Sequence, residues 1–159
     1  MLDKIGIKIL QNLQSEGRLT NAELAHRVNL SPAACLERVR RLQDEGYILG
    51  YTALLDPNRL DAGLLAYIEV EMERYSPAQS EPFRKLMLDI PEVMECHLVT
   101  GPFDYLIKAR VRDMLAYREF LDRVFSTLKG VRRTNSYVVM EELKSSTRVP
   151  FSYISPPTR

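Results

Sequence analysis

The chain contains 159 residues, 45% of them hydrophobic, and carries a formal net charge of +1. This length allows one large or two small domains with a buried core, and no apolar run approaches the roughly 18 residues that span a membrane. Because the net charge is so small, a polyanionic partner can be bound only by positive charge gathered on one part of the surface.

Residues 3–15 are predicted to form the first helix. Their apolar residues recur at helical spacing, and Asp3 is the expected N-cap. Gly6 lies inside this helix and lowers its stability by about 1 kcal/mol relative to alanine. We expect the apolar stripe to close a small core with the helices that follow. The stripe consists of Ile5, Ile9, Leu10 and Leu13.

The stretch 20–46 predicts two more helices with a short break between them. Thr20 and Glu23 have the spacing of a capping box, and Ser31 followed by Pro32 is a second helix start. Gly46 is the expected C-cap. Two short helices so close together are typical of a helix-turn-helix, whose second helix enters the major groove of DNA.

The helix that starts at Ser31 has two distinct faces. Cys35, Val39 and Leu42 fall on one stripe and are expected to be buried. On the opposite face, small residues allow close approach to base edges, and the arginines further along can reach guanines or phosphates. An ordinary amphipathic helix with a solvated basic face fits the same spacing equally well. The candidate DNA-contacting residues are Ser31, Ala33, Ala34, Glu37, Arg38, Arg40 and Arg41.

Residues 47–57 form an apolar, β-prone run, YILGYTALLDP, that ends at Asp56-Pro57. A strand after the third helix resembles the wing of a winged helix-turn-helix. Tyr51 and Thr52 can touch the DNA backbone there, although a plain strand role is the favoured interpretation. Residues 58–63 are rich in turn formers and are interpreted as a linker, which gives a first domain of residues 1–63.

The second half of the chain has the alternating pattern of a β-sheet. From Ile68 onward, apolar and charged residues alternate, which predicts a strand over 64–74. The pattern then predicts a helix over 76–90, strands over 93–100 and 105–112, a helix over 113–128 and a strand over 131–143. This order is that of a ferredoxin-like βαββαβ domain over residues 64–159. The fold class is therefore α+β.

Charged residues on two of these strands predict how the strands pair. The first and third strands of a ferredoxin-like sheet are antiparallel neighbours, so three acids are expected opposite three bases on one face. Opposite charges across a strand pair contribute about 0.2–1 kcal/mol each. Two independently solvated faces are the alternative. The acids are Glu69, Glu71 and Glu73, and the bases are Lys108, Arg110 and Arg112.

Catalysis has little support among these residues. Cys96 and His97 are neighbours on a predicted strand, so their side chains point to opposite faces and cannot form a nucleophile–base pair. No metal-ligand spacing or phosphate-binding loop is present, and no cofactor is expected. Cys35 and Cys96 both lie in apolar stretches, so we expect reduced core thiols in a cytoplasmic protein.

The chain resembles the Lrp/AsnC (feast/famine) regulators in three long motifs: SPAACLERVRRLQDEGYILGYTALLDP, ECHLVTGPFDYLIKARVRDMLAYREFL and SYVVMEELKSST. The resemblance extends from Leu2 to about Arg148. It implies a transcription regulator with an N-terminal winged helix-turn-helix. It also implies a C-terminal ferredoxin-like domain that dimerises, assembles further and binds an amino acid effector.

The resemblance implies an effector site around the turn between the second and third strands of the C-terminal domain. Backbone N–H groups at a glycine turn suit a carboxylate, Asp104 suits an ammonium group, and apolar neighbours suit an apolar side chain. Asp104 lies outside the predicted core, so the fold is expected to tolerate its removal. The implied residues are Leu98, Thr100, Gly101, Pro102, Phe103, Asp104, Met114, Tyr137, Val138 and Val139.

Two departures from the family pattern fall on these sites. Ala33-Ala34 stands where Thr-Pro is common in the recognition helix, which bears on base preference. Pro102 stands where Asp is common, which removes a carboxylate and a backbone N–H from the effector turn.

We therefore expect a sequence-specific transcription regulator that binds double-stranded DNA. Its assembly or DNA affinity is expected to respond to a small apolar amino acid of the leucine or methionine type. The expected form is a homodimer that assembles to higher oligomers, with no membrane partner. An architectural, DNA-condensing protein with low sequence preference and no amino acid effector is the alternative, and a specificity ratio over competitor DNA separates the two.

Overall fold

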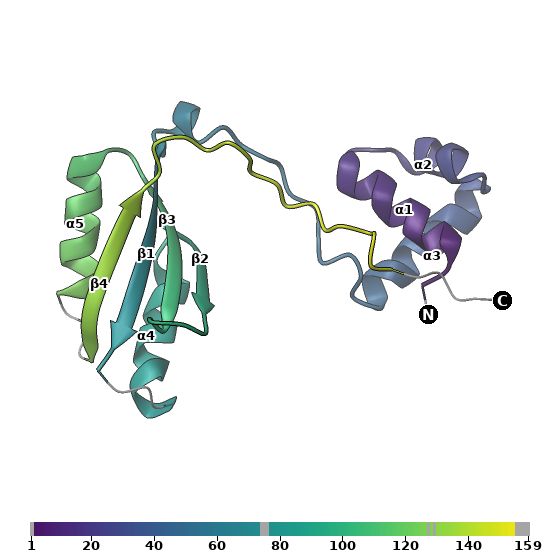
Figure 1. The fold of residues 1–159 in the computed structure, drawn as a ribbon. Helices are drawn as coiled ribbons and strands as arrows, with labels where there is room; N and C mark the ends of the chain where they lie inside the picture. The colour runs from purple at the N-terminus through teal and green to yellow at the C-terminus, as the bar shows by residue number, and fades with distance from the viewer. Residues whose placement is uncertain (1, 74–76, 127, 129, 155–159) are drawn as a thin grey trace. The chain divides into compact units, whose positions relative to one another are not determined.

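The computed structural model describes residues 2–73, 77–126, 128 and 130–154, which fall into two units (Figure 1). The first unit joins the residues up to Leu54 with the tail from Lys144 onward, and the second unit covers Leu55–Leu143. Within the described residues, no helix combines the length and the apolar character needed to cross a lipid bilayer.

The helices of the first unit begin at the predicted start signals. The Asp3 carboxylate accepts a hydrogen bond from the Gly6 backbone N–H at 2.7 Å. Thr20 and Glu23 form a reciprocal capping box, and the Ser31 hydroxyl accepts from the first turn of its helix. These caps satisfy backbone N–H groups that the first turn of a helix leaves without partners. The three helices are α1 (Lys4–Ser15), α2 (Asn21–Val28) and α3 (Pro32–Asp44).

A small apolar core lies where these three helices meet. Ile9 and Cys35 are fully buried, and Val39 of the predicted stripe is half-buried. Burial raises the pKa of the Cys35 thiol, so this thiol stays protonated near neutral pH. The second cysteine, Cys96, was expected in a core but is exposed, because it lies on an edge strand of the sheet. The buried core residues are Ile9, Leu24, Ala25, Val28, Cys35 and Leu42.

The glycine inside α1 has a packing reason. Gly6 is buried, and a Cβ at this position would lie 2.9 Å from the Leu2 side chain and 3.2 Å from the Asp3 carboxylate. A larger residue would displace one of these neighbours. The lower helix propensity of glycine is therefore offset by close packing at the helix start.

Residues 49–56 form neither helix nor strand, so the predicted wing strand is wrong for this structure. Ile48 packs against the helical core, but Leu49 and Leu54 are exposed. A β-prone segment becomes a strand only when its N–H and C=O groups pair with a neighbouring strand. No described strand of the sheet pairs with this segment.

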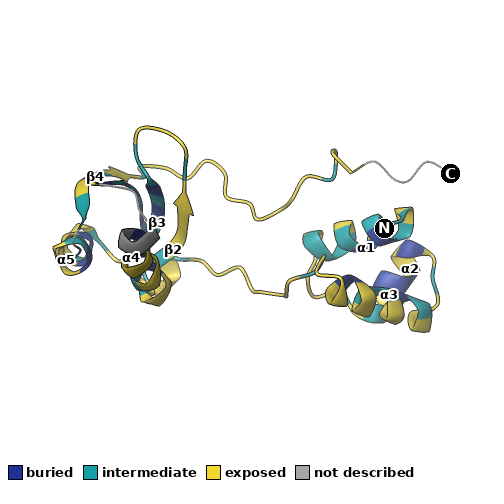
Figure 2. Ribbon diagram, turned by 90° about the horizontal axis from the view of Figure 1, so that it is seen from below, coloured by how far each residue is buried: buried dark blue, intermediate teal, exposed yellow. Residues whose placement is uncertain are grey.

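The second unit is an antiparallel four-stranded sheet with two helices on one face (Figures 1 and 2). Its strand order is β2-β3-β1-β4, which is the ferredoxin-like arrangement that the sequence predicts. The predicted helix start at Ser76 lies outside the described residues. The elements are β1 (Leu64–Met72), α4 (Pro77–Asp89), β2 (Val93–Leu98), β3 (Tyr105–Val111), α5 (Met114–Phe125) and β4 (Val131–Val138), preceded by a short 3-10 helix, Asn58–Leu60.

Side-chain alternation along β1 separates the two faces of the sheet. Ala66, Ile68 and Val70 are fully buried beneath the helices. Tyr67 and Glu69 point to the opposite face, here called the open face, and are half-buried. The core beneath the helices also contains Phe83, Met87, Tyr105, Ile107, Tyr117, Phe120 and Val124.

The predicted acid–base ladder between β1 and β3 is wrong in its register. Glu69 lies opposite Leu106, and Lys108 lies opposite Tyr67. The acids occupy the later half of β1 and the bases the later half of β3, and antiparallel pairing places these two halves at opposite ends. The charges find other partners on the open face: Lys108 pairs with Glu95 at 3.0 Å, Arg110 with Glu142 at 3.1 Å and Arg132 with Glu71 at 2.9 Å.

The C-terminal tail contacts α1 in the first unit. The Gln14 side chain donates to the Val149 carbonyl oxygen at 3.0 Å and accepts from the Val149 N–H at 2.7 Å. These two hydrogen bonds explain why the tail groups with the first unit. The sequence-based division, with its boundary at residues 63 and 64, assigned the tail to the second domain. The observed grouping differs in both the boundary and the tail.

We predict that Gln14→Ala releases the tail from α1. The substitution removes both hydrogen bonds, each of which contributes about 0.5–1.5 kcal/mol. Limited trypsin digestion followed by mass spectrometry should therefore show severalfold faster cleavage after Lys144 and Arg148. Gln11→Ala, on the same helix, is the control and should cleave at the wild-type rate. Equal rates for the two variants would contradict the tail contact.

Candidate DNA-binding helix and effector site

Helix α3 presents the predicted DNA-contacting face to solvent (Figure 2). Its buried side carries Cys35 and Leu42, as the helical spacing predicted. Among the candidate residues, Ala34 and Arg38 are half-buried. The exposed candidates are Ser31, Ala33, Glu37, Arg40 and Arg41.

The three candidate arginines of α3 differ in their partners. Arg38 Nη1 contacts Asp3 Oδ2 at 2.7 Å, and Arg41 Nε lies 3.5 Å from Glu45 Oε1. The Gly6 backbone N–H, followed by Arg38, holds the pKa of Asp3 below its usual value, against the opposing effect of burial. Within the described residues, Arg40 has no ion pair or hydrogen bond. Arg40 is therefore the arginine of this set that can meet a phosphate or base without leaving a partner.

Sequence analysis missed one exposed residue of α3, Leu36. It follows Cys35 directly but lies outside the buried stripe, and 40% of its surface is exposed although the residue is apolar. An apolar side chain on a recognition helix can contact the methyl group of thymine. The position of Leu36 beside the buried stripe was the only signal available in the sequence.

The candidate effector turn joins β2 to β3. The Val99 N–H donates to the Asp104 carbonyl oxygen, and the Asp104 N–H donates to the Val70 carbonyl oxygen, both at 2.9 Å. Thr100, Gly101 and Pro102 are exposed at the tip of the turn. Gly101 has φ near +152°, at the edge of the region that favours glycine.

Asp104 has a structural contact that sequence analysis did not predict. Its Oδ2 accepts a hydrogen bond from the Met72 backbone N–H at 2.7 Å. Met72 lies at an irregularity of register between Glu71 and Met72, where β1 and β4 lose regular pairing. The carboxylate thus satisfies a backbone donor at a β-bulge, which contradicts the expectation that the fold tolerates removal of Asp104. Within the described residues, the other carboxylate oxygen has no hydrogen-bond partner.

The remaining effector candidates lie at the other end of the sheet. Val138 of β4 pairs with Ala66 of β1, whereas Tyr105, next to the turn, pairs with Val70. Four residues of strand separate these two positions, or about 13 Å. One protomer therefore does not bring the two groups together. The turn group is Leu98, Thr100, Gly101, Pro102, Phe103 and Asp104, and the distal group is Met114, Tyr137, Val138 and Val139.

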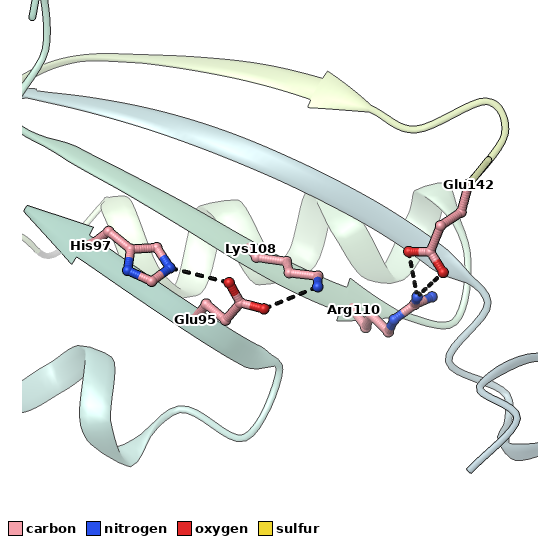
Figure 3. Close-up of polar contacts among 5 residues, drawn as sticks. All are labelled: Glu95, His97, Lys108, Arg110 and Glu142. Atoms are coloured by element: carbon pink, nitrogen blue, oxygen red, sulfur yellow. Dashed lines mark hydrogen bonds and ion pairs between the residues drawn. The ribbon is translucent and has the colours of Figure 1, made fainter. Parts of the chain in front are cut away.

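Several charges on the open face of the sheet are held in pairs (Figure 3). Glu95 lies between His97, at 3.1 Å, and Lys108, at 3.0 Å. Hydrogen bonds from His97 and Lys108 lower the pKa of Glu95, and the bond to Glu95 raises the pKa of Lys108. The side chains of Lys108 and Arg110 are only 19% and 16% exposed. This face is therefore partly desolvated although no described helix covers it.

The geometry of β2 agrees with the argument against a Cys–His nucleophile. His97 points to the open face beside Glu95 (Figure 3), and Cys96 is paired with Ile107, whose side chain lies in the core beneath the helices. The two neighbours thus point to opposite faces. Within the described residues, no group of three or more potential metal ligands comes together.

Comparison with known proteins bears on both sites. Residues 2–48 match the family model described as winged helix-turn-helix DNA-binding, and residues 65–149 match the Lrp/AsnC ligand binding domain. The chain is 52% identical over 148 residues to the leucine-responsive regulatory proteins of Klebsiella pneumoniae and Escherichia coli strain K12, which covers 93% of this chain and 90% of each relative.

Solved structures of transcriptional regulators are similar over almost the whole chain. A regulator from Neisseria meningitidis in complex with L-Met superimposes with a TM-score of 0.91 at 41% identity, covering 96% of this chain and 99% of that one. An AsnC family regulator from Agrobacterium tumefaciens has the same TM-score, 0.91, at 30% identity and with the same coverage of 96% and 99%.

We predict that Asp104→Ala destabilises the second unit, whereas Asp104→Asn does so much less. Alanine leaves the Met72 N–H without its acceptor, which costs about 1–3 kcal/mol for a buried donor. The asparagine carbonyl oxygen can still accept that hydrogen bond. Urea unfolding followed by circular dichroism measures both variants. An Asp104→Ala protein as stable as wild type would show that the contact contributes nothing.

Proposed function

Since this chain belongs to the Lrp/AsnC family, we propose that α3 is its DNA-recognition helix and that the turn of residues 99–104 holds its effector. Family membership makes the chain a DNA-binding transcription regulator that responds to an amino acid. The finer proposal concerns which residues make each contact and which amino acid binds. It places the protein in the cytoplasm, together with its DNA.

The DNA-binding proposal rests on the exposed face of α3. Its buried side is fixed by the helical core, so Ala33, Glu37 and Arg40 face solvent together. Small side chains near the start of the helix allow the backbone to approach base edges, and Arg40 supplies a charge for phosphate or guanine. Ser31, Ala34 and Arg41 complete the proposed contact surface.

The effector proposal rests on the turn group together with the distal group. The carboxylate of Asp104 has one oxygen without a partner among the described residues, and this oxygen suits an ammonium group. Leu98 is half exposed beside the turn, as are Met114 and Tyr137 of the distal group. Because about 13 Å of strand separates the two groups in one protomer, we propose that the turn group of one copy meets the distal group of another.

The proposed ligand is an apolar amino acid of the leucine or methionine type. Two similarities support it: relatives at 52% identity are leucine-responsive regulatory proteins, and a regulator at 41% identity has been solved with L-Met. Pro102 supplies no backbone N–H, so the carboxylate of the ligand has to be held by the remaining N–H groups of the turn.

We propose a homodimer, assembled further, as the working form. The open face carries Tyr67 and Glu69 of β1 beside the poorly exposed Lys108 and Arg110. A second copy of the same face covers these groups in a symmetric, self-complementary contact. An architectural protein with little sequence preference uses the same helix and the same dimer, so the affinity ratio between selected and scrambled duplexes separates that alternative.

We predict that Arg40→Glu weakens binding to all duplex sequences. Phosphate attraction is independent of sequence, and loss of one contact lowers the slope of log affinity against log salt by about 0.9. Fluorescence anisotropy with a duplex selected from a random library, and with a scrambled duplex, measures both quantities. Arg59→Glu, a charge reversal at an exposed site outside α3, is the control and should bind almost normally. Reversal of both Arg40 and Arg41 without any loss at moderate salt would refute the assignment of α3.

We also predict that Glu37→Ala changes the preferred sequence rather than the overall affinity. Removing a carboxylate from the proposed contact surface alters which base edges are favoured. Selection from a random library with the variant and the wild type compares the two motifs. Identical selected motifs would remove Glu37 from the specificity-determining set.

We predict that leucine or methionine binds and shifts the oligomer distribution or the DNA affinity. A ligand alters function only through different affinities for different assembly states, and the expected coupling is about 1–3 kcal/mol. Calorimetry with both amino acids, and with aspartate as the control, tests binding; light scattering follows assembly. Asp104→Asn should lose the response while remaining folded.

Two outcomes would contradict parts of this proposal separately. Absence of heat or thermal stabilisation with any of the twenty amino acids at millimolar concentration would refute the effector site but leave DNA binding standing. A monomer at micromolar concentration in light scattering would refute the dimer and, with it, the effector site shared between copies.

A further inference from the structure

The Asp3 carboxylate connects the start of α1 to α3. One oxygen, Oδ1, accepts the backbone N–H of Gly6 at 2.7 Å, and the other, Oδ2, contacts Nη1 of Arg38 at 2.7 Å. Each oxygen therefore has a separate partner, one in α1 and one in α3. Asp3 is both a helix cap and half of an ion pair between helices.

Space around this carboxylate is limited by close packing. A Cβ at Gly6 would lie 3.2 Å from Asp3 Oδ1 and 2.9 Å from the Leu2 side chain. The glycine thus makes room for the carboxylate at the point where it both caps α1 and reaches α3. Side-chain exposure is 29% for Arg38 and 43% for Asp3, so solvent screens the pair only in part.

Arg38 differs from the other two arginines of α3 because its ion-pair partner belongs to another helix. Its guanidinium is committed to α1, whereas the Arg41 pair with Glu45 stays within α3 at 3.5 Å and Arg41 is 56% exposed. Within the described residues, Arg40 has no ion pair at all. For Arg38 to reach a phosphate, it would have to leave Asp3 and expose an unpaired carboxylate to the same phosphate.

We propose that Arg38 is a positioning residue, which through Asp3 fixes the orientation of α3 on α1, and that it makes no contact with DNA. This inference rests on the proposed role of α3 as the recognition helix. The two arginines then have different roles: Arg40 contacts the DNA, and Arg38 orients the helix that carries Arg40. A small rotation of α3 on its core would move the exposed face out of register with the groove.

Substitution of Asp3 distinguishes this role from a direct contact between Arg38 and DNA, because the two roles predict opposite changes in DNA affinity. Asp3→Asn keeps the cap, since asparagine caps helices as well as aspartate, but its single carbonyl oxygen leaves an amide group facing Arg38. If Arg38 contacted phosphate, removing the acid would free Arg38, and DNA affinity would rise. If the pair positions α3, DNA affinity falls.

The test is a double-mutant cycle with Asp3→Asn, Arg38→Gln and the two combined, on the selected and scrambled duplexes. Each single variant is expected to lower affinity for the selected duplex about fivefold. A loss of this size lies within the range of coupling measured between two side chains that contact each other. The double variant should be no weaker than the weaker single variant. Arg38→Gln should leave the salt slope unchanged, whereas Arg40→Gln should lower it by about 0.9. Arg38→Lys, which can still pair with Asp3, should restore most of the affinity, and circular dichroism checks that every variant is folded.

Three results would overturn the proposal while leaving α3 as the recognition helix: a gain of affinity in Asp3→Asn, a salt slope in Arg38→Gln that falls as far as in Arg40→Gln, or additive losses in the double variant. If Arg40→Gln also has no effect on either duplex, the recognition-helix assignment itself fails. The two failures are thus distinguishable in the same set of titrations.

Discussion

Strand β1 lies between β3 and β4. The alternation of its side chains determines which residues of the second unit are buried and which remain on the open face. Successive residues of a strand point to opposite faces, so burial of Ala66, Ile68 and Val70 beneath the helices commits the intervening residues to the open face. Two edges and one open face then remain for contacts outside the protomer. A slip of one residue would exchange the faces, which is why the register of β1 is so strongly specified.

The same register also separates the candidate effector residues. Antiparallel pairing puts the turn before Tyr105 at one end of β1 and the last residues of β4 at the other. A single chain therefore keeps the two groups apart, and the proposed effector site combines the turn group of one copy with the distal group of another. Under this arrangement, ligand binding and assembly are linked, because a ligand that touches two copies favours the state in which they meet.

The first unit has a smaller core, which contains six buried residues among those that the structure describes. Such a core leaves the relative orientation of its helices dependent on a few polar contacts. The Asp3–Arg38 pair fixes α3 to α1, and the Gln14–Val149 hydrogen bonds attach the C-terminal tail to the same α1. Helix α1 is thus in contact with both the proposed recognition helix and the C-terminal tail, at a residue where the match to the ligand binding domain ends.

Local signals in the sequence determined the helix starts, the buried stripes and the order of elements. The caps at Asp3, Thr20 and Ser31 were readable because capping depends on residues within one turn, and the ferredoxin-like order was readable from periodicity alone. Family motifs identified both candidate sites. The tertiary structure decided what depends on partners distant in the chain: the register that replaced the expected charge ladder, the hydrogen bond from Met72 to Asp104, and the unpaired segment 49–56. The physical reason is that periodicity assigns a residue to a face, whereas strand register and packing between helices determine its partner on that face. Register and packing depend on residues far apart in the chain, so neighbouring residues do not predict them.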